Sequence, residues 1–356
     1  MSPVSALAQL KEFKTSFDEE LLKYIRGKKF EAKEIDERYG VFIDCLEDFV
    51  VRGGKRVRPA FMYFAYLSVG GNERKKALLA SRTPELLQSF LLIHDDIIDR
   101  SPLRRGKPTI HKLMETEFER LRLLGDKNHF GVSTAIIVGD LAHMYAYDAL
   151  MTSGFDLPIL EEARKKFDEI TFQTAAGWYR EFISTMGVEA SEEEMLKTVG
   201  YVSAVYTIAG PVQMGAILGG GSEEQIRRLT SYGMKLGIAF QIRDDILGMF
   251  GNEAELGKPV SSDMKEGKKT LLVRRMTNKL GRADKKTFLS IYGKSGEDKD
   301  LEWVRDKMRE TGALKEAEDE SLKLAKEAIK ELTDFPQNEG TGFLAGIAEY
   351  VVTRKV

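Results

Sequence analysis

Residues 91–111 read LLIHDDIIDRSPLRRGKPTIH and contain the most distinctive chemical pattern of the chain. Apolar residues at helical spacing predict a helix over about 84–100. On this helix Asp95, Asp96 and Asp99 lie at positions i, i+1 and i+4, where like charges destabilise a helix and favour a bound cation. Oxygen ligands without paired thiols favour Mg²⁺, which usually also binds substrate phosphates. The alternative interpretation is a solvated acidic turn.

A second acidic pair lies in residues 239–270, AFQIRDDILGMFGNEAELGKPVSSDMKEGKKT. Asp244 and Asp245 are on another largely apolar predicted helix, and Gln241 shares a stripe with them by the 3.6-residue period. Facing helices of a bundle are a common place for a metal site. The two acidic groups together therefore predict a cluster of Mg²⁺ ions, whereas the alternative is two inert surface turns.

Basic residues gather in three groups close to these acids in the sequence. They are Lys55, Arg56 and Arg58 in GGKRVRP, Arg104 and Arg105 after the first acidic group, and Lys258, Lys268 and Lys269 after the second. Arginine matches phosphate oxygens with two parallel hydrogen bonds, and lysine supplies a mobile charge. Each group alone is typical of a solvated surface. Together with the acids they predict a highly anionic, metal-bridged ligand, such as one or two diphosphates.

The remaining sequence predicts an all-α fold, because apolar residues recur at helical spacing and strand-like alternation is absent. The expected helices cover about 4–27, 32–52, 60–69, 84–100, 111–124, 130–153, 157–186, 191–218 and 222–250, and some four shorter helices follow. Ser222 and Gln225 have the spacing of a capping box. Gln88, Leu91 and Asp95 share one stripe, which favours an apolar channel below a metal-binding mouth.

Composition excludes several classes of protein. The 356 residues carry 54 Lys and Arg against 56 Asp and Glu, a net charge of −2 that argues against nucleic-acid binding through a basic surface. The single cysteine, Cys45, cannot form an internal disulfide. Neither a targeting segment nor an apolar run long enough for a transmembrane segment is visible, so we expect a cytoplasmic protein. Without a linker or repeat, we expect one domain over residues 1–356.

Four ordered motifs resemble the trans-isoprenyl diphosphate synthases, the polyprenyl synthetase family. They are GGKRVRP at 53–59, HDDIIDRSPLRRGKPT at 94–109, FQIRDDILGMFG at 240–251 and GKPVSSDMKEGKKT at 257–270. The resemblance implies a single large bundle of antiparallel helices around a deep central cavity, assembled as a homodimer. It also implies the Mg²⁺-dependent head-to-tail condensation of isopentenyl diphosphate with an allylic diphosphate, by ionisation, condensation and elimination.

The resemblance also implies roles for individual residues. Asp95 and Asp99 would bind two Mg²⁺ ions and Asp244 a third, with Asp96 and Asp245 in support. The allylic diphosphate would be bound by Arg104, Lys258 and Lys268, and the diphosphate of isopentenyl diphosphate by Lys55, Arg58, Gln88 and Arg105. Gln241 would be a further polar group of the active site.

Product length is expected to depend on Phe90 and Leu91, which lie five and four positions before the first acidic motif. This pattern resembles geranylgeranyl diphosphate synthases of the archaeal type and implies a C20 product, with farnesyl diphosphate as the alternative. A non-catalytic subunit of a heteromeric synthase is a second alternative. It is favoured by Val202 and Trp178, which stand where the family has lysine and glutamine. Gly248 replaces a third aspartate of the second motif.

Overall fold

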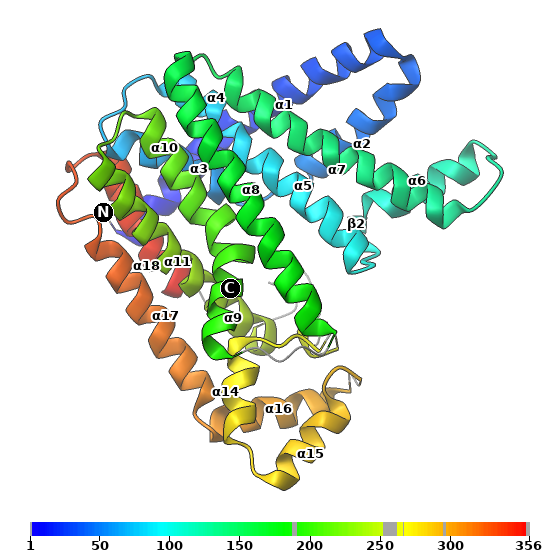
Figure 1. Ribbon diagram of the computed structural model, residues 1–356, viewed down its shortest axis with the longest axis vertical. Helices are drawn as coiled ribbons and strands as arrows, with labels where there is room; N and C mark the ends of the chain where they lie inside the picture. Colours follow the sequence, from blue (N-terminus) through cyan, green and yellow to red (C-terminus); the bar gives the residue numbers. More distant parts are fainter. Residues whose placement is uncertain (1, 187–190, 252–261, 266, 295–296, 354–356) are drawn as a thin grey trace. The chain divides into compact units, whose positions relative to one another are not determined.

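The computed structural model describes residues 2–186, 191–251, 262–265, 267–294 and 297–353. Helices form nearly all of the described chain, which confirms the predicted all-α class (Figure 1). The exception is an antiparallel pair, β1 (Leu103–Arg104) and β2 (Lys107–Pro108), within the basic loop. Sequence periodicity did not predict this pair, because two residues per strand are too few to alternate.

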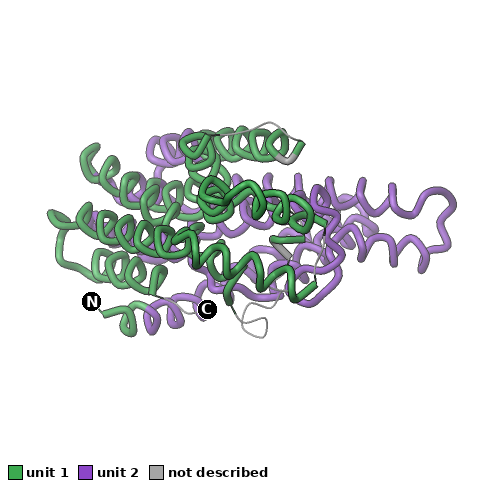
Figure 2. Tube along the Cα trace, turned by 90° about the horizontal axis from the view of Figure 1, so that it is seen from below, with its two compact units in different colours: residues 1–6, 168–213, 222–356 green, residues 7–167, 214–221 purple. Residues whose placement is uncertain are grey.

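Contacts divide the chain into two compact units, coloured separately in Figure 2. Unit 1 contains residues 1–6, 168–213 and 222–356, and unit 2 contains residues 7–167 and 214–221. The first acidic motif and the GGKRVRP segment belong to unit 2, and the second acidic motif belongs to unit 1. The expectation of one domain over residues 1–356 stays a prediction.

Unit 2 is built around the packing of α5 on α7. Its elements are α1 (Pro3–Ile35), η1 (Glu37–Tyr39), α2 (Gly40–Val51), α3 (Val57–Ser68), α4 (Arg74–Ala80), α5 (Arg82–Ile98), α6 (Ile110–Arg120) and α7 (Lys127–Met151), with the start of α8 (Leu157–Thr185). Small residues on α7, including the fully buried Ala135 and Ala142, let α5 approach closely. A Cβ atom at Gly139 would lie 2.3 Å from Nε2 of His94, so the His94 ring of α5 packs directly against the α7 backbone at this glycine.

Unit 1 is built around α11. Its elements are the rest of α8, α9 (Glu192–Val199), the π-helix η2 (Gly200–Ala209), α10 (Gly210–Leu218, continuing into unit 2), α11 (Glu223–Phe250), α13 (Ser262–Lys265), α14 (Leu271–Lys279), α15 (Arg282–Ile291), α16 (Asp298–Glu310), α17 (Ala313–Lys330) and α18 (Glu339–Thr353). The predicted capping box of Ser222 and Gln225 is present. At Gly237 a Cβ atom would lie 2.5 Å from Cα of Ala204, so α11 and η2 pack backbone to backbone.

Several predicted boundaries were wrong. The helix expected to end at residue 27 continues to Ile35, because one glycine costs a helix only about 1 kcal/mol. Helix α4 was missed, and the helix expected over 191–218 is interrupted by η2. The segment Glu192–Leu218 is long and apolar enough to cross a membrane, but 72% of its apolar window is buried inside the protein, as in an ordinary core helix.

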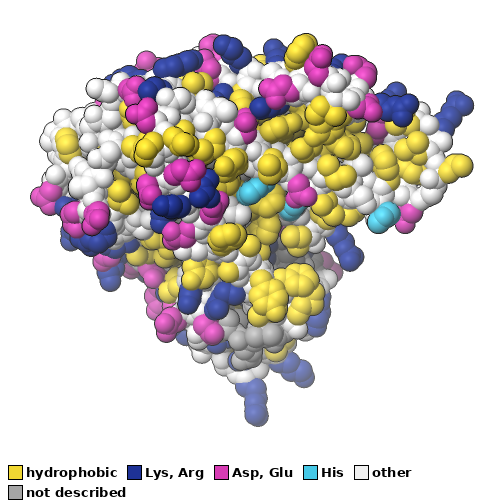
Figure 3. All heavy atoms as spheres, turned by 45° about the horizontal axis from the view of Figure 1, so that its top comes forward, with side chains coloured by type: hydrophobic (Ala, Val, Ile, Leu, Met, Phe, Trp, Pro, Cys, Tyr) yellow, Lys and Arg dark blue, Asp and Glu magenta, His cyan; other side chains and the backbone are white. Residues whose placement is uncertain are grey.

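Charges of both signs alternate over the face shown in Figure 3, and hydrophobic side chains lie between them. On that face the described basic side chains are interspersed with acidic ones rather than joined into one continuous surface. On this face, acidic and basic side chains are therefore mixed locally, in keeping with the near-zero net charge of −2 of the chain.

Candidate active site

The first acidic motif lies at the carboxyl end of α5, where each aspartate has a different environment. Asp96 is buried with 1% exposure, Asp95 is half-buried, and Asp99 is exposed in the residue after the helix. The backbone amide of Asp99 donates to the Asp95 carbonyl oxygen at 2.8 Å, which continues the helical turn. Carboxylates at this end of a helix are disfavoured by its dipole, so the motif needs positive charge nearby.

Arg104 supplies that charge within unit 2. The β1–β2 turn brings the side chain back to α5, where Nε donates to Oδ1 of Asp96 at 2.7 Å and Nη2 to Oδ2 of Asp95 at 3.0 Å. Burial raises the pKa of Asp96 although Arg104 opposes the shift. Burial would lower the pKa of Arg104, but its bonds to Asp96 and Asp95 outweigh this and raise it. Arg104 therefore stays charged and neutralises part of the acidic motif.

Arg105 lies against the GGKRVRP segment. Its Nη1 donates to the carbonyl oxygen of Gly53, and a Cβ atom at Gly54 would lie 3.3 Å from its Nη2. The pKa of Arg105 is lowered, chiefly by burial and further by the nearby arginines, although Glu85 opposes the shift. These arginines are Arg56, Arg104 and Arg58. A guanidinium in such surroundings is stabilised by a bound anion.

The other predicted diphosphate ligands of unit 2 differ in exposure. Lys55 is exposed, Arg58 is half-buried in the first turn of α3, and Gln88 is half-buried on α5. Gln88 lies three residues after Glu85 and so on the same side of the helix. Glu85 is 5% exposed and pairs with Arg56, a contact that the sequence did not predict. The sequence feature that could have pointed to Glu85 is its i, i+3 spacing from Gln88, a predicted diphosphate ligand.

Mg²⁺ suits the oxygen donors of the first motif. The described residues contain no group of three or more His, Cys, Asp or Glu side chains that could hold a metal ion by themselves. Mg²⁺ does not require such a group, because it binds through one or two carboxylates with phosphate and water as its other ligands. Asp95 and Asp99 reach solvent, whereas Oδ2 of the buried Asp96 has no hydrogen-bond partner among the described residues. The solvent-accessible carboxylates of the motif are thus Asp95 and Asp99, and their role as metal ligands stays a prediction.

The second acidic motif lies on α11 of unit 1, where Asp244 and Asp245 are half-buried. Gln241 donates through Nε2 to Oδ1 of Asp245 at 2.8 Å, and its Oε1 accepts from Oγ of Ser203 at 2.8 Å. The hydroxyl of Ser203, on the π-helix, therefore orients the amide of Gln241 toward Asp245. This contact could not be read from the sequence, because the two residues are 38 positions apart.

The basic residues after the second motif are only partly described. Lys258 lies outside the described residues. The exposed Lys268 is held through its backbone, since the hydroxyl of Tyr292 donates to its carbonyl oxygen at 2.7 Å. Lys269 donates instead to the carbonyl oxygen of Ser184 at 2.7 Å, which gives it a structural contact at the end of α8.

Phe90, the predicted determinant of product length, belongs to a cluster of rings. It packs edge-on against His94 and His143, with centroids 4.8 and 5.0 Å away, and His143 packs against Phe167 at 5.3 Å. Leu91 is buried with 4% exposure. The cluster joins α5, α7 and α8, and sequence reasoning did not find His143 or Phe167, because neither residue is in a local motif.

Known proteins resemble this chain in sequence and in structure. Residues 41–308 match the family model described as polyprenyl synthetase. The geranylgeranyl diphosphate synthase of Saccharolobus solfataricus is 32% identical over 85% of this chain and 87% of its own length. The geranylfarnesyl diphosphate synthase of Aeropyrum pernix is 30% identical over 85% and 91%.

A solved structure supports the same assignment. It is the crystal structure of a geranylgeranyl pyrophosphate synthase from Corynebacterium glutamicum complexed with isoprenyl diphosphate and magnesium. That structure superposes with a TM-score of 0.90 at 31% identity, covering 97% of this chain and 99% of the other. The four ordered motifs, the all-α fold and these similarities together show that the chain belongs to the polyprenyl synthetase family.

Proposed function

We propose that the protein is a prenyltransferase that condenses isopentenyl diphosphate head to tail with an allylic diphosphate. The observation that carries the proposal lies in unit 2. The carboxylates at the end of α5 bind Arg104, and Arg105 lies beside the GGKRVRP segment among further arginines. In a member of the polyprenyl synthetase family, this combination suits a metal-bridged diphosphate next to a second, cation-bound diphosphate.

In the proposed reaction the allylic carbon–oxygen bond breaks, and the diphosphate leaves with the electron pair. The double bond of isopentenyl diphosphate then attacks the allylic carbon, and the resulting cation gives one proton to the released diphosphate, which restores a double bond. Charge on the departing diphosphate is stabilised by Arg104 together with Lys258 and Lys268. Lys55, Arg58, Gln88 and Arg105 hold the other diphosphate in position. Positioning and electrostatic stabilisation are thus the main work of the side chains.

Divalent metal use agrees with the magnesium in the Corynebacterium glutamicum structure. Bound Mg²⁺ would neutralise diphosphate oxygens and so make the diphosphate a better leaving group. We propose three Mg²⁺ ions, two held by Asp95 and Asp99 and one by Asp244. Asp96 would support Asp95 by holding Arg104, and Asp245 would support Asp244 together with Gln241.

We propose geranylgeranyl diphosphate as the main product. The Saccharolobus solfataricus relative is named for this C20 product, and Phe90 gives a bulky residue one turn and a half below Asp95. The Aeropyrum pernix relative, named for geranylfarnesyl diphosphate, makes a C25 product the competing candidate. We also propose a cytoplasmic homodimer without nucleic-acid partners.

The test is an elongation assay with the purified full chain. The protein is incubated with Mg²⁺, isopentenyl diphosphate and dimethylallyl, geranyl or farnesyl diphosphate, and product lengths are identified by mass spectrometry. We expect all three primers to be extended mainly to C20. If folded protein extends no primer, the proposed enzyme activity is contradicted and the non-catalytic subunit is favoured. A main product of C15 or C25 would overturn the C20 proposal.

A further inference from the structure

Arg56 is the one cation of the GGKRVRP segment that faces the protein interior. It is 4% exposed, whereas Lys55 before it is exposed and Arg58 after it is half-buried. The proposed function assigns a diphosphate to Lys55 and Arg58 but gives Arg56 no part. A buried guanidinium has to be compensated by nearby carboxylates and acceptors, so its contacts indicate what it holds together.

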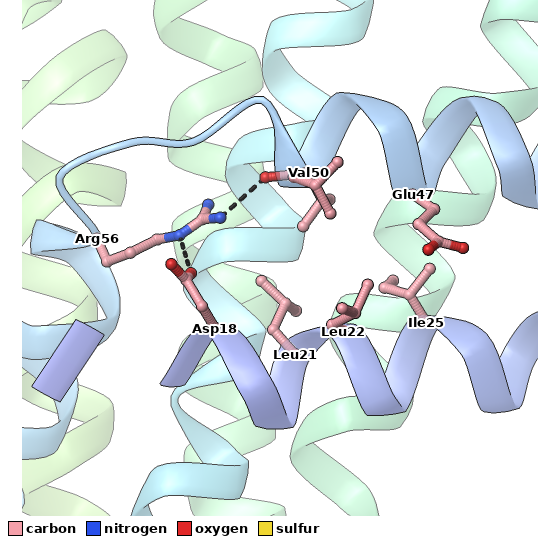
Figure 4. A pocket seen from close by; sticks show the side chains of 8 residues that line it. Asp18, Leu21, Leu22, Ile25, Glu47, Val50 and Arg56 are labelled. Atoms are coloured by element: carbon pink, nitrogen blue, oxygen red, sulfur yellow. Dashed lines mark hydrogen bonds and ion pairs between the residues drawn. The ribbon is translucent and has the colours of Figure 1, made fainter. Parts of the chain in front are cut away.

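The guanidinium of Arg56 joins three helices to the segment. Its Nε donates to Oδ1 of Asp18 on α1 at 2.7 Å, and its Nη2 donates to the carbonyl oxygen of Val50 near the end of α2 at 2.8 Å (Figure 4). Its Nη1 donates to the buried carboxylate of Glu85 on α5. Each edge of the planar fork is therefore used, which the single ammonium of a lysine cannot reproduce.

The backbone of Arg56 is also unusual. Its φ of 53° lies in the left-handed region, which costs free energy for any residue with a Cβ atom. Such a conformation persists where the surroundings fix it. Here the fixed side chain supplies that restraint, and α3, which carries Arg58, begins at the next residue.

The contacts of Arg56 lead directly to the proposed diphosphate ligands. Arg105 donates to the carbonyl oxygen of Gly53, three residues before Arg56. Glu85, the partner of Arg56, also favours the charged form of Arg105. Arg56 therefore restrains the segment between Lys55 and Arg58 and holds the carboxylate that balances Arg105.

We propose that Arg56 is a positioning residue for the diphosphate of isopentenyl diphosphate. It acts through Lys55, Arg58 and Arg105 and does not itself contact the substrate. This inference rests on the proposed function, since it deepens the assignment of the same site. It separates Arg56 from the two other cations of the motif, which share its charge but not its environment.

Two substitutions separate the effect of the Arg56 side-chain contacts from the effect of the Arg56 backbone conformation. Arg56→Gly accepts a φ of 53° without strain but removes every side-chain contact. Arg56→Lys keeps the charge and one of the ion pairs but loses the fork. A pocket of about 140 Å³, lined by Asp18, Arg56, Glu47 and neighbouring apolar side chains, allows water to reach Asp18 in both variants. The buried Glu85 loses its partner in Arg56→Gly, which lowers the stability of that variant, whereas Arg56→Lys keeps a positive charge beside Glu85 and so keeps the test decisive. Circular dichroism of the full chain checks that each variant is folded.

The readout is steady-state kinetics with each substrate varied in turn. Because displacing a binding group by about 1 Å can cost up to about 100-fold, we expect Arg56→Gly to raise KM for isopentenyl diphosphate about tenfold. KM for the allylic substrate should change less than about twofold, and Arg56→Lys should lie between wild type and Arg56→Gly. The matched control is Arg26→Ala. It breaks an exposed pair with Glu47, another residue lining the pocket, and should leave both KM values unchanged.

Two results would overturn the inference. The first is an Arg56→Gly protein with wild-type KM for isopentenyl diphosphate, and the second is an equal rise of both KM values. Hydrogen exchange over residues 53–58 provides a measurement that is independent of turnover. Exchange should be faster in Arg56→Gly and Arg56→Lys than in wild type and Arg26→Ala, and unchanged exchange would contradict the anchoring role. If wild type itself fails to elongate any primer, the proposed function fails, while the exchange result still decides whether Arg56 holds the segment.

Discussion

Replacing Arg104 by glutamine should destabilise the protein strongly, because it leaves the carboxylate of Asp96 buried without its partner. Asp96 is 1% exposed, and Arg104 donates to it at 2.7 Å. Breaking a buried ion pair from one side costs about 3–5 kcal/mol. The Arg104 side chain is 25% exposed, so we expect the lower end, a loss of about 3 kcal/mol in the free energy of unfolding.

The pH dependence follows from the sign of the pKa shift. Burial already raises the pKa of Asp96, and Arg104 is the main group that opposes this shift. In Arg104→Gln the folded state should therefore hold the Asp96 proton more tightly than the unfolded state does. The loss in the free energy of unfolding, relative to wild type, is largest at about pH 7. It becomes smaller as the pH falls through the raised pKa of Asp96, because protonation removes the unpaired charge.

Urea unfolding, followed by circular dichroism at about pH 7 and at a series of lower pH values, measures both effects. The double variant Asp96→Asn/Arg104→Gln should regain part of the lost stability, since it has no unpaired buried charge. Arg120→Gln is the control, because it breaks an exposed pair with Glu117 and should leave the unfolding midpoint unchanged. A loss below about 1 kcal/mol, or a loss that does not become smaller at any lower pH, would refute the reasoning about Asp96.

Three further predictions concern activity. Phe90→Ala opens the ring cluster with His94 and His143 and should lengthen the product; an unchanged product distribution, measured by mass spectrometry, would place the determinant elsewhere. Ser203→Ala removes the donor to Gln241 and should lower kcat about tenfold, whereas Ser203→Thr keeps the hydroxyl and most of the rate; equal rates for both variants would contradict the orienting role. Chelation of Mg²⁺ by EDTA should abolish turnover and added Mg²⁺ should restore it, so turnover that survives chelation would exclude the metal role.

The fold class and the two acidic motifs were predictable because their signals are local. Helical periodicity predicted the class, and Asp95 and Asp99 are four positions apart in the sequence, which is about one helical turn. Some boundaries failed for a physical reason, since α1 continues through Gly27 where its packing offsets the cost of one glycine. Propensity alone could not show that compensation.

The partners of the site residues could not be predicted in the same way. Arg56 donates a hydrogen bond to Glu85, which is 29 positions away in the sequence, and Ser203 donates to Gln241, which is 38 positions away. Only tertiary packing brings these residues together. The sequence also could not separate Arg56 from Lys55 and Arg58, because burial distinguishes three cations that are chemically alike. The assignment of individual ligands therefore stays a prediction.

One measurement tests the central claim most directly: incorporation of radiolabelled isopentenyl diphosphate into farnesyl diphosphate by the wild-type chain and by Asp95→Ala, with Mg²⁺ present. Wild type should form a C20 diphosphate, and folded Asp95→Ala should form none, because the carboxylate that binds metal at the end of α5 is lost. Incorporation by Asp95→Ala at the wild-type rate, or none by folded wild type, would contradict the account.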